Sequence, residues 1–137
     1  MSRRHFSVPD ANATLPFVER VVRDVVGDYG RWKDALEQYE LAAAGATVSS
    51  GEPEEAGRLR LRVDDLAARI EGFVEELNQV GCVLKGFEEG LVDFPARMDD
   101  REVYLCWRLG EPGVAHWHEA NDGFTGRQVL VPALLER

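Results

Sequence analysis

Apolar side chains recur at alternating steps of three and four along the first third of the chain. The series is Leu15, Val18, Val22, Val25, Tyr29, Trp32, Leu36, Tyr39 and Ala43. This heptad spacing is typical of a helix that buries one stripe against a partner. Just before it, Ser7 precedes Pro9 and Asp10, an arrangement that favours a helix start. The pattern therefore predicts a long helix over residues 8–44.

A second stripe with the same spacing follows a short polar break. Its members are Leu59, Val63, Leu66, Ile70, Phe73, Leu77 and Val80. The break at 45–53 is rich in Gly, Ser and Pro, which are turn residues, and Gly81 favours a helix end. We expect a second helix over 54–80. Because a short turn joins two long helices, they should pack as an antiparallel hairpin.

After Gly81 the pattern changes to the alternation typical of strands. The expected strands are 82–87, 91–94, 103–109 and 114–118, with turns at 95–102 and 110–113, where polar residues, Gly and Pro gather. The fold class predicted is α+β, a long antiparallel helical hairpin followed by a small antiparallel β-meander. We expect a single domain over 1–137, with the sheet spanning 82–118 and a C-terminal tail at 119–137.

Alternation also predicts which side chains share a face of this sheet. Val103, Leu105 and Trp107 should face the helices, together with Val92 and Phe94. The opposite face would carry the polar side chains Glu89, Asp93, Tyr104, Cys106, Arg108, His116 and His118. If Val92 lies opposite Leu105, Glu89 falls opposite Arg108, where the two can form a cross-strand ion pair.

Composition narrows the class of protein and its partners. The 137 residues carry a net charge of −9, which disfavours nucleic acid and anionic membranes as partners. No apolar run approaches the roughly 20 residues of a membrane span, and the first residues do not resemble a secretory signal. Two cysteines, Cys82 and Cys106, fit a reducing compartment. We expect a soluble cytoplasmic protein of bacterial type.

One hypothesis for the polar face is a metal site. His116 and His118 are two residues apart on a predicted strand and project to one side. Imidazoles combined with a carboxylate or a thiolate suit a divalent transition metal. The side chains that could complete the set are Asp93, Cys106, Glu111 and Glu119.

A second hypothesis is a small-molecule or catalytic pocket on the same face. Its candidate acid–base group is His118, because imidazole titrates near neutral pH. Arg108 and Arg127 could grip an anion, and Glu111 is a further catalytic candidate. The candidate walls of a cofactor or ligand pocket are Trp107, Trp117 and Phe124.

A third hypothesis makes the protein a non-catalytic association module, and the sequence favours it. Trp107 and Trp117 would then anchor the core, and Cys106 would be a buried apolar residue. Apolar residues also flank both helical stripes, at Phe17, Val21, Val26, Ala68 and Val74. A second copy of the chain would cover them, so we expect a homodimer formed through the helices.

The segments GLVDFP (90–95), REVYLCWRLGE (101–111), WHEANDGFTGRQ (117–128) and FSVPDANATLP (6–16) resemble the bacterial domain-of-unknown-function family 2203. The resemblance spans nearly the whole chain but implies no established activity. The matching positions are Asp93, Phe94, Pro95, Tyr104, Cys106, Trp107, Glu111, Trp117, His118, Gly123, Phe124, Gly126 and Arg127. The resemblance implies an aromatic residue at the position of His116, which makes His118 the expected centre of any site on this face.

Overall fold

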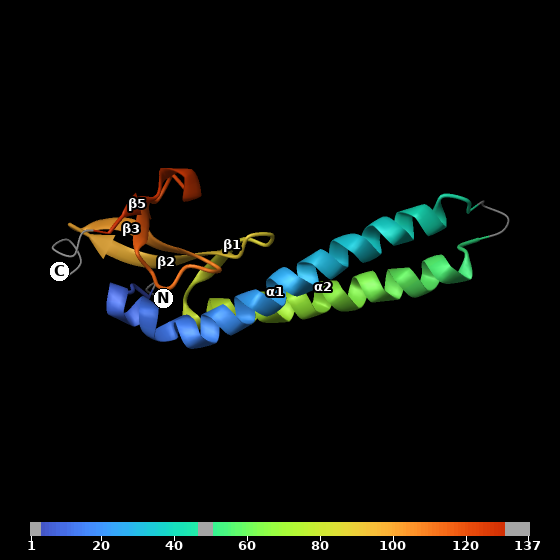
Figure 1. The fold of residues 1–137 in the computed structure, drawn as a ribbon, viewed down its shortest axis with the longest axis horizontal. Helices are drawn as coiled ribbons and strands as arrows, with labels where there is room; N and C mark the ends of the chain where they lie inside the picture. The colour runs from blue at the N-terminus through green and yellow to red at the C-terminus, as the bar shows by residue number, and fades with distance from the viewer. Residues whose placement is uncertain (1–3, 47–50, 131–137) are drawn as a thin grey trace.

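Two long antiparallel helices form a hairpin, and a small sheet packs against one end of it (Figure 1). The computed structural model describes residues 4–46 and 51–130. Helix α1 spans Val8–Ala43 and helix α2 spans Glu54–Val80. The Ser7 side chain accepts a hydrogen bond from the Asp10 N–H, and Gly81 ends α2 at a φ of 111°. The predicted helical hairpin is confirmed. The sequence could predict it because helix caps and apolar spacing depend on residues that are close together in the chain.

The sheet is an antiparallel meander of five strands in chain order. The strands are β1 Val83–Gly86, β2 Leu91–Met98, β3 Arg101–Arg108, β4 His116–Glu119 and β5 Gln128–Val129. A short 3-10 helix, Phe124–Gly126, precedes β5. The predicted α+β class is thus confirmed. Strand β5 lies in the stretch predicted to be a C-terminal tail, 119–137, and residues 131–137 of that stretch lie outside the described residues.

The hairpin between β2 and β3 is tighter than the sequence suggested. The predicted loop at 95–102 is wrong, because both strands run on to a two-residue turn at Asp99 and Asp100, whose φ angles are 52° and 63°. Positive φ at both positions matches the twist of a tight hairpin. Pro95 is accommodated within β2 because β1 pairs only as far as Asp93, and a proline is tolerated where no neighbouring strand needs its N–H.

The register of β2 against β3 also differs from the expectation. Val92 lies opposite Trp107 rather than Leu105, and Leu91 lies opposite Arg108. The expected pair between Glu89 and Arg108 is therefore wrong. The offset amounts to two residues, so the side chains of β2 and β3 keep their predicted faces, because side chains alternate with a period of two. Glu89, which was predicted on the polar face, lies instead in the turn between β1 and β2.

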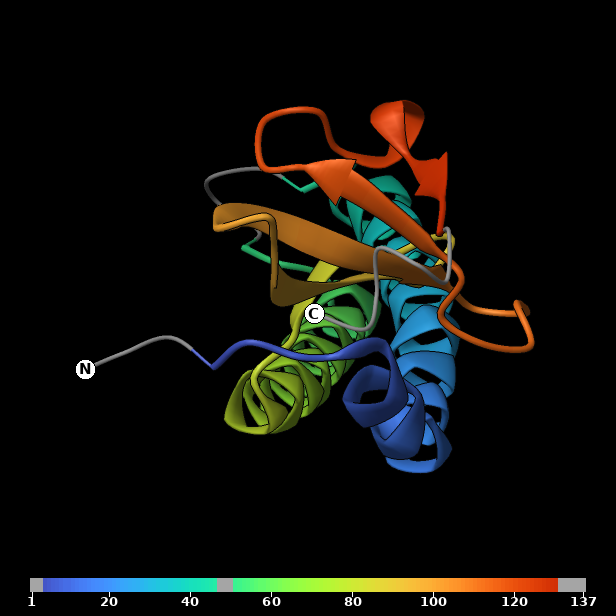
Figure 2. The same ribbon diagram turned by 90° about the vertical axis from the view of Figure 1, so that its left-hand side faces the viewer.

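One face of the sheet packs against the helices at one end of the hairpin (Figure 2). Val18, Val22 and Val25 of α1 are fully buried there, as are Val92 and Trp107 of the sheet. The other face of the sheet points away from the helices and carries the polar residues. Neither α1 nor α2 is long and apolar enough to cross a membrane, in the part of the chain that the structure describes.

Candidate metal centre

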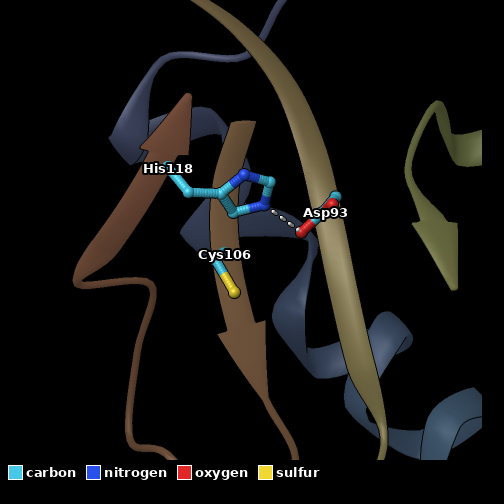
Figure 3. Close-up of side chains that lie close together, drawn as sticks. All are labelled: Asp93, Cys106 and His118. Atoms are coloured by element: carbon cyan, nitrogen blue, oxygen red, sulfur yellow. Dashed lines mark hydrogen bonds and ion pairs between the residues drawn. The ribbon is translucent and has the colours of Figure 1, made fainter. Parts of the chain in front are cut away.

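Three neighbouring strands bring a carboxylate, a thiol and an imidazole together (Figure 3). Asp93 of β2 lies directly opposite Cys106 of β3. His118 of β4 lies opposite Tyr104, one diagonal step from Cys106. Their side chains share the face of the sheet that points away from the helices, as their alternation with Val92, Leu105 and Trp117 requires.

The three side chains converge on one point. The ligand atoms of Asp93, Cys106 and His118 all lie within 4.8 Å of one another. Nε2 of His118 is 3.0 Å from Oδ1 of Asp93. The residues are only 4%, 1% and 2% exposed, respectively. A buried cluster of this composition is one of the settings in which proteins bind a transition metal.

The second nitrogen of His118 shows how the ring is oriented. Nδ1 lies 2.8 Å from the backbone oxygen of Glu119. A carbonyl oxygen can only accept a hydrogen bond, so Nδ1 must carry a proton and donate. Nε2 is then the nitrogen that faces Asp93 and Cys106. Metal-binding histidines are held in the same way, with the second nitrogen donating to a carbonyl or a carboxylate.

Burial controls the protonation of the thiol. It raises the pKa of Cys106 to about 11; the nearby Arg127 guanidinium lowers it, and the Asp93 carboxylate raises it. With no metal ion present, Cys106 is therefore a neutral thiol at neutral pH. A bound cation would lower the pKa of Cys106 and convert the thiol to a thiolate, because metal coordination deprotonates a thiol.

A small cavity opens beside the three ligands. Its volume is about 300 Å³, and its lining residues are Lys85, Leu91, Asp93, Tyr104, Cys106, His118, Ala120, Gly123 and Phe124. The rings of Tyr104 and His118 lie 5.5 Å apart. A small molecule in this cavity would contact the donor atoms of the three ligands directly.

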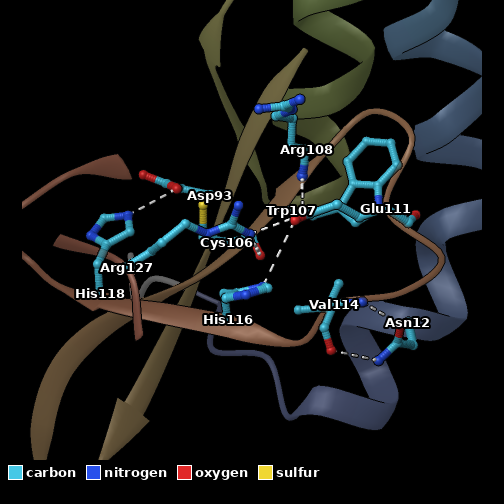
Figure 4. Close-up of polar contacts among 10 residues, drawn as sticks. All are labelled: Asn12, Asp93, Cys106, Trp107, Arg108, Glu111, Val114, His116, His118 and Arg127. Atoms are coloured by element: carbon cyan, nitrogen blue, oxygen red, sulfur yellow. Dashed lines mark hydrogen bonds and ion pairs between the residues drawn. The ribbon is translucent and has the colours of Figure 1, made fainter. Parts of the chain in front are cut away.

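A second polar network centred on Glu111 borders this site (Figure 4). Oε1 of Glu111 accepts hydrogen bonds from Nη2 of Arg127 at 2.9 Å and from the backbone N–H of Arg108 at 2.8 Å. Burial raises the pKa of Glu111, but these hydrogen bonds and the charge of Arg127 outweigh it and lower the pKa overall. The Arg127 guanidinium also lies 4.6 Å from the centre of the Phe124 ring. Glu111 thus holds Arg127 in place, and Arg127 supports one wall of the cavity.

His116 and His118, which were predicted to share one metal site, belong to different polar clusters in the structure. His118 joins Asp93 and Cys106, whereas His116 lies opposite Cys106 and its Nδ1 is 3.8 Å from Oε2 of Glu111. That Nδ1 is buried without a hydrogen-bond partner among the described residues. Asp93, Cys106 and His118 meet at one point, whereas His116 and Glu111 form the second network and the Glu119 carboxylate pairs with Arg101.

The remaining candidates lie in four different places. Trp107 and Trp117 are buried on the helix-facing side of the sheet, and the Trp107 indole N–H donates to the backbone oxygen of Glu111 at 3.0 Å. Neither tryptophan lines the cavity, but Phe124 does. The Arg108 side chain is exposed, and the guanidinium of Arg127 is already paired with Glu111.

Sequence reasoning missed three residues that shape the molecule. Lys85 lines the cavity. It follows the buried Leu84 in the sequence, and this alternation could have predicted that Lys85 lies on the polar face of the sheet. Asn12 of α1 accepts a hydrogen bond from the Val114 N–H at 2.8 Å and ties the strand-connecting loop to the helix. Asp28 is buried in α1 and pairs with Arg31 and Arg69, each at 3.0 Å. Neither the Asn12–Val114 contact nor the Asp28–Arg69 pair has a local sequence signature, because each joins segments far apart along the chain.

Comparison with other proteins gives a family but no characterised relative. No curated protein and no solved structure matches the chain. One family model, described as an uncharacterized conserved protein, DUF2203, matches residues 4–130. The match includes both helices, the whole sheet and the Asp93, Cys106 and His118 cluster. The chain belongs to the DUF2203 family.

Proposed function

We propose that this protein binds one divalent transition-metal ion, zinc in the first instance, through Asp93, Cys106 and His118. The observation that carries the proposal is the convergence of three buried donors, one each from three neighbouring strands, within 4.8 Å of one another. An imidazole and a thiolate together favour zinc over magnesium or calcium, which prefer oxygen ligands.

The dimensions of the cluster are compatible with such an ion. Metal–ligand bonds of roughly 2.0–2.3 Å place the ligands of a tetrahedral zinc roughly 3.3–3.8 Å apart. Asp93 and His118 lie slightly closer than this, at 3.0 Å, and the whole set lies within 4.8 Å. Small side-chain rotations would therefore admit the ion without a change in the strands.

Three protein ligands leave a fourth position for water or a ligand, as in catalytic zinc sites. The cavity of about 300 Å³ beside the cluster gives that position access to small molecules. These features support a site of exchange or chemistry rather than a closed structural centre. The reducing cytoplasm expected from the sequence is the compartment in which such a cysteine stays available as a ligand.

Elemental analysis of protein purified without a histidine tag tests the proposal. We expect one equivalent of zinc, or of another transition metal, after incubation with that metal and removal of the excess. Cys106→Ser and His118→Gln should each lose the ion. The matched controls are Cys82→Ser and His116→Gln, which change the same residue types outside the cluster and should keep it.

Two results would contradict this assignment. One is a wild-type protein that retains no transition metal after reconstitution. The other is a metal content that falls equally in Cys82→Ser and Cys106→Ser, since that would place the ion elsewhere or reflect unfolding alone.

A second role, self-association through the helical hairpin, rests on a different observation. The half of the hairpin beyond the sheet has no cover from it (Figure 1). Leu41 and Leu61 on the helices are 71% and 59% exposed. We infer that a second copy of the chain covers this part, which makes the protein a dimeric association module as well as a metal-binding one.

Light scattering at micromolar concentration tests the dimer. We expect twice the monomer mass for the wild-type chain and a shift to monomer for Leu61→Glu, which places a charge on the proposed interface. Leu61→Ser serves as a milder variant in case the charge disturbs folding. A wild-type monomer would exclude the dimer and leave the metal proposal untouched.

A further inference from the structure

We infer that the metal centre binds small carboxylic acids with an apolar body, and that Lys85 provides the charge that selects them. This inference rests on the proposed function, since the carboxylate would lie between the metal ion and the Lys85 ammonium. It goes further by naming a ligand class and a residue outside the metal ligands that determines it.

The backbone of β1 places Lys85 at the cavity. Leu84 pairs with Val92 and Gly86 pairs with Leu91, so Lys85 is an extra residue between two adjacent pairing positions of β2. This irregularity is a β-bulge, a feature that is common beside functional sites because it re-aims a side chain. The bulged residue here is the one whose side chain lines the cavity.

The charges at the cavity indicate that its ligand is an anion. A divalent ion would be balanced by the Asp93 carboxylate and the Cys106 thiolate. Lys85 adds a positive charge at the same cavity, and within residues 4–46 and 51–130 no ion pair engages it. An anion that binds the metal would therefore also neutralise Lys85.

The neighbouring arginine does not compete for that role. Arg127 is nearby, but its guanidinium is paired with Glu111 at 2.9 Å and is only 15% exposed. Among the described residues that line the cavity, Lys85 is the one with a permanent positive charge. A ligand with a single negative charge matches this arrangement better than a polyanion does.

The walls and the size of the cavity define the rest of the ligand. Leu91, Ala120 and Phe124 provide apolar surface, and Arg127 steadies the Phe124 ring from outside. The volume of about 300 Å³ is at the small end of ligand pockets. These features fit a carboxylate attached to a compact hydrocarbon group, such as a benzoate-sized acid.

Cobalt-loaded protein allows a direct test, because the visible absorption bands of Co²⁺ respond to a change of ligand. Benzoate and its neutral analogue benzamide are each titrated into the Co²⁺ protein. Benzoate should shift the bands and bind at least about tenfold more tightly than benzamide, the factor that one charge-assisted hydrogen bond supplies. In Lys85→Met this preference for benzoate should disappear.

The same substitution at the other lysine of the chain provides the control. Lys33 pairs with Glu88 and does not line the cavity, so Lys33→Met should keep the benzoate preference. Equal affinity for benzoate and benzamide in the wild type, or an unchanged preference in Lys85→Met, would overturn the inference while the Co²⁺ spectrum still showed an intact metal site. A protein that acquires no Co²⁺ bands at all would instead overturn the proposed metal function, and the ligand inference with it.

Discussion

His118 and Asp93 are in contact although they belong to strands that are not neighbours. Nε2 of His118 on β4 lies 3.0 Å from Oδ1 of Asp93 on β2, and β3 runs between the two strands. Both side chains reach across β3, directly beside Cys106 (Figure 3). The pair is almost completely buried, with side-chain exposures of 2% and 6%. Removing one side chain of such a pair leaves the other buried without its polar partner, which destabilises the folded state.

This relationship predicts how zinc affects thermal stability. A ligand that binds only the folded state raises the melting temperature of the protein, and a tighter ligand raises it further. Added zinc should therefore raise the Tm of the wild type and of His116→Ala, but not the Tm of His118→Ala. Differential scanning fluorimetry with and without zinc measures both effects. An equal zinc response in His118→Ala would show that His118 is not a ligand.

Metal binding should also release a proton from Cys106. Burial raises the pKa of that thiol to about 11, so it is protonated at pH 7 and must lose its proton to coordinate the ion. Calorimetric titration with zinc, repeated in buffers of different ionisation enthalpy, gives the number of protons released. We expect the wild type to release at least about one proton for each zinc ion bound, and Cys106→Ser to show no binding heat. Zinc binding by the wild type without proton release would count against the thiolate ligand.

The metal-free protein should lose stability at alkaline pH through its two buried thiols. Burial raises the pKa of Cys106 from 9.0 to about 11 and that of Cys82 from 9.0 to about 12. Because the folded-state values are the higher ones, the stabilisation is present below pH 9 and is lost as the pH rises through them. Urea unfolding between pH 8 and 11 should show a loss that is smaller by about 2 kcal/mol in Cys106→Ala. If Cys106→Ala lost as much stability as the wild type over this pH range, the Cys106 thiol would not be the source of the loss.

The buried Asp28 should matter for the hairpin but not for the metal. Its two carboxylate oxygens contact Arg31 and Arg69, each at 3.0 Å, and so join α1 to α2. Asp28→Ala breaks both pairs but leaves two arginines that are more than half exposed and stay hydrated, so we expect a loss of about 1–2 kcal/mol in the free energy of unfolding. Asp24→Ala, one turn earlier and exposed, should cost about 0.5 kcal/mol or less. Urea titration measures the difference, and metal content should be equal in both variants.

The Glu111–Arg127 pair should behave as a coupled unit. It is partly buried, and Glu111 also accepts the Arg108 N–H. A double-mutant cycle with Glu111→Gln and Arg127→Met should give a coupling of about 1 kcal/mol in the free energy of unfolding. Breaking the pair should also raise the pKa of Glu111, because its hydrogen bond from Arg127 is one of the contacts that lower it. Additive effects would mean that each residue acts alone.

The sequence by itself determined the features that depend on local repetition. The heptad spacing, Ser7 and Gly81 predict α1 and α2 nearly to the residue, because capping and helix periodicity involve neighbours in the chain. Alternation likewise predicts the faces of β2, β3 and β4. A register offset of two residues left that prediction intact, since side-chain direction repeats every second residue.

Tertiary structure decided which residues of the polar face meet. His116 and His118 are equivalent in an alternating pattern, yet the register of β4 on β3 brings only His118 to Asp93 and Cys106. The burial of Asp28 between the two helices has no local signature either. Contacts between distant segments depend on how the strands and helices pack, and that packing is a property of the whole chain rather than of any repeat within it.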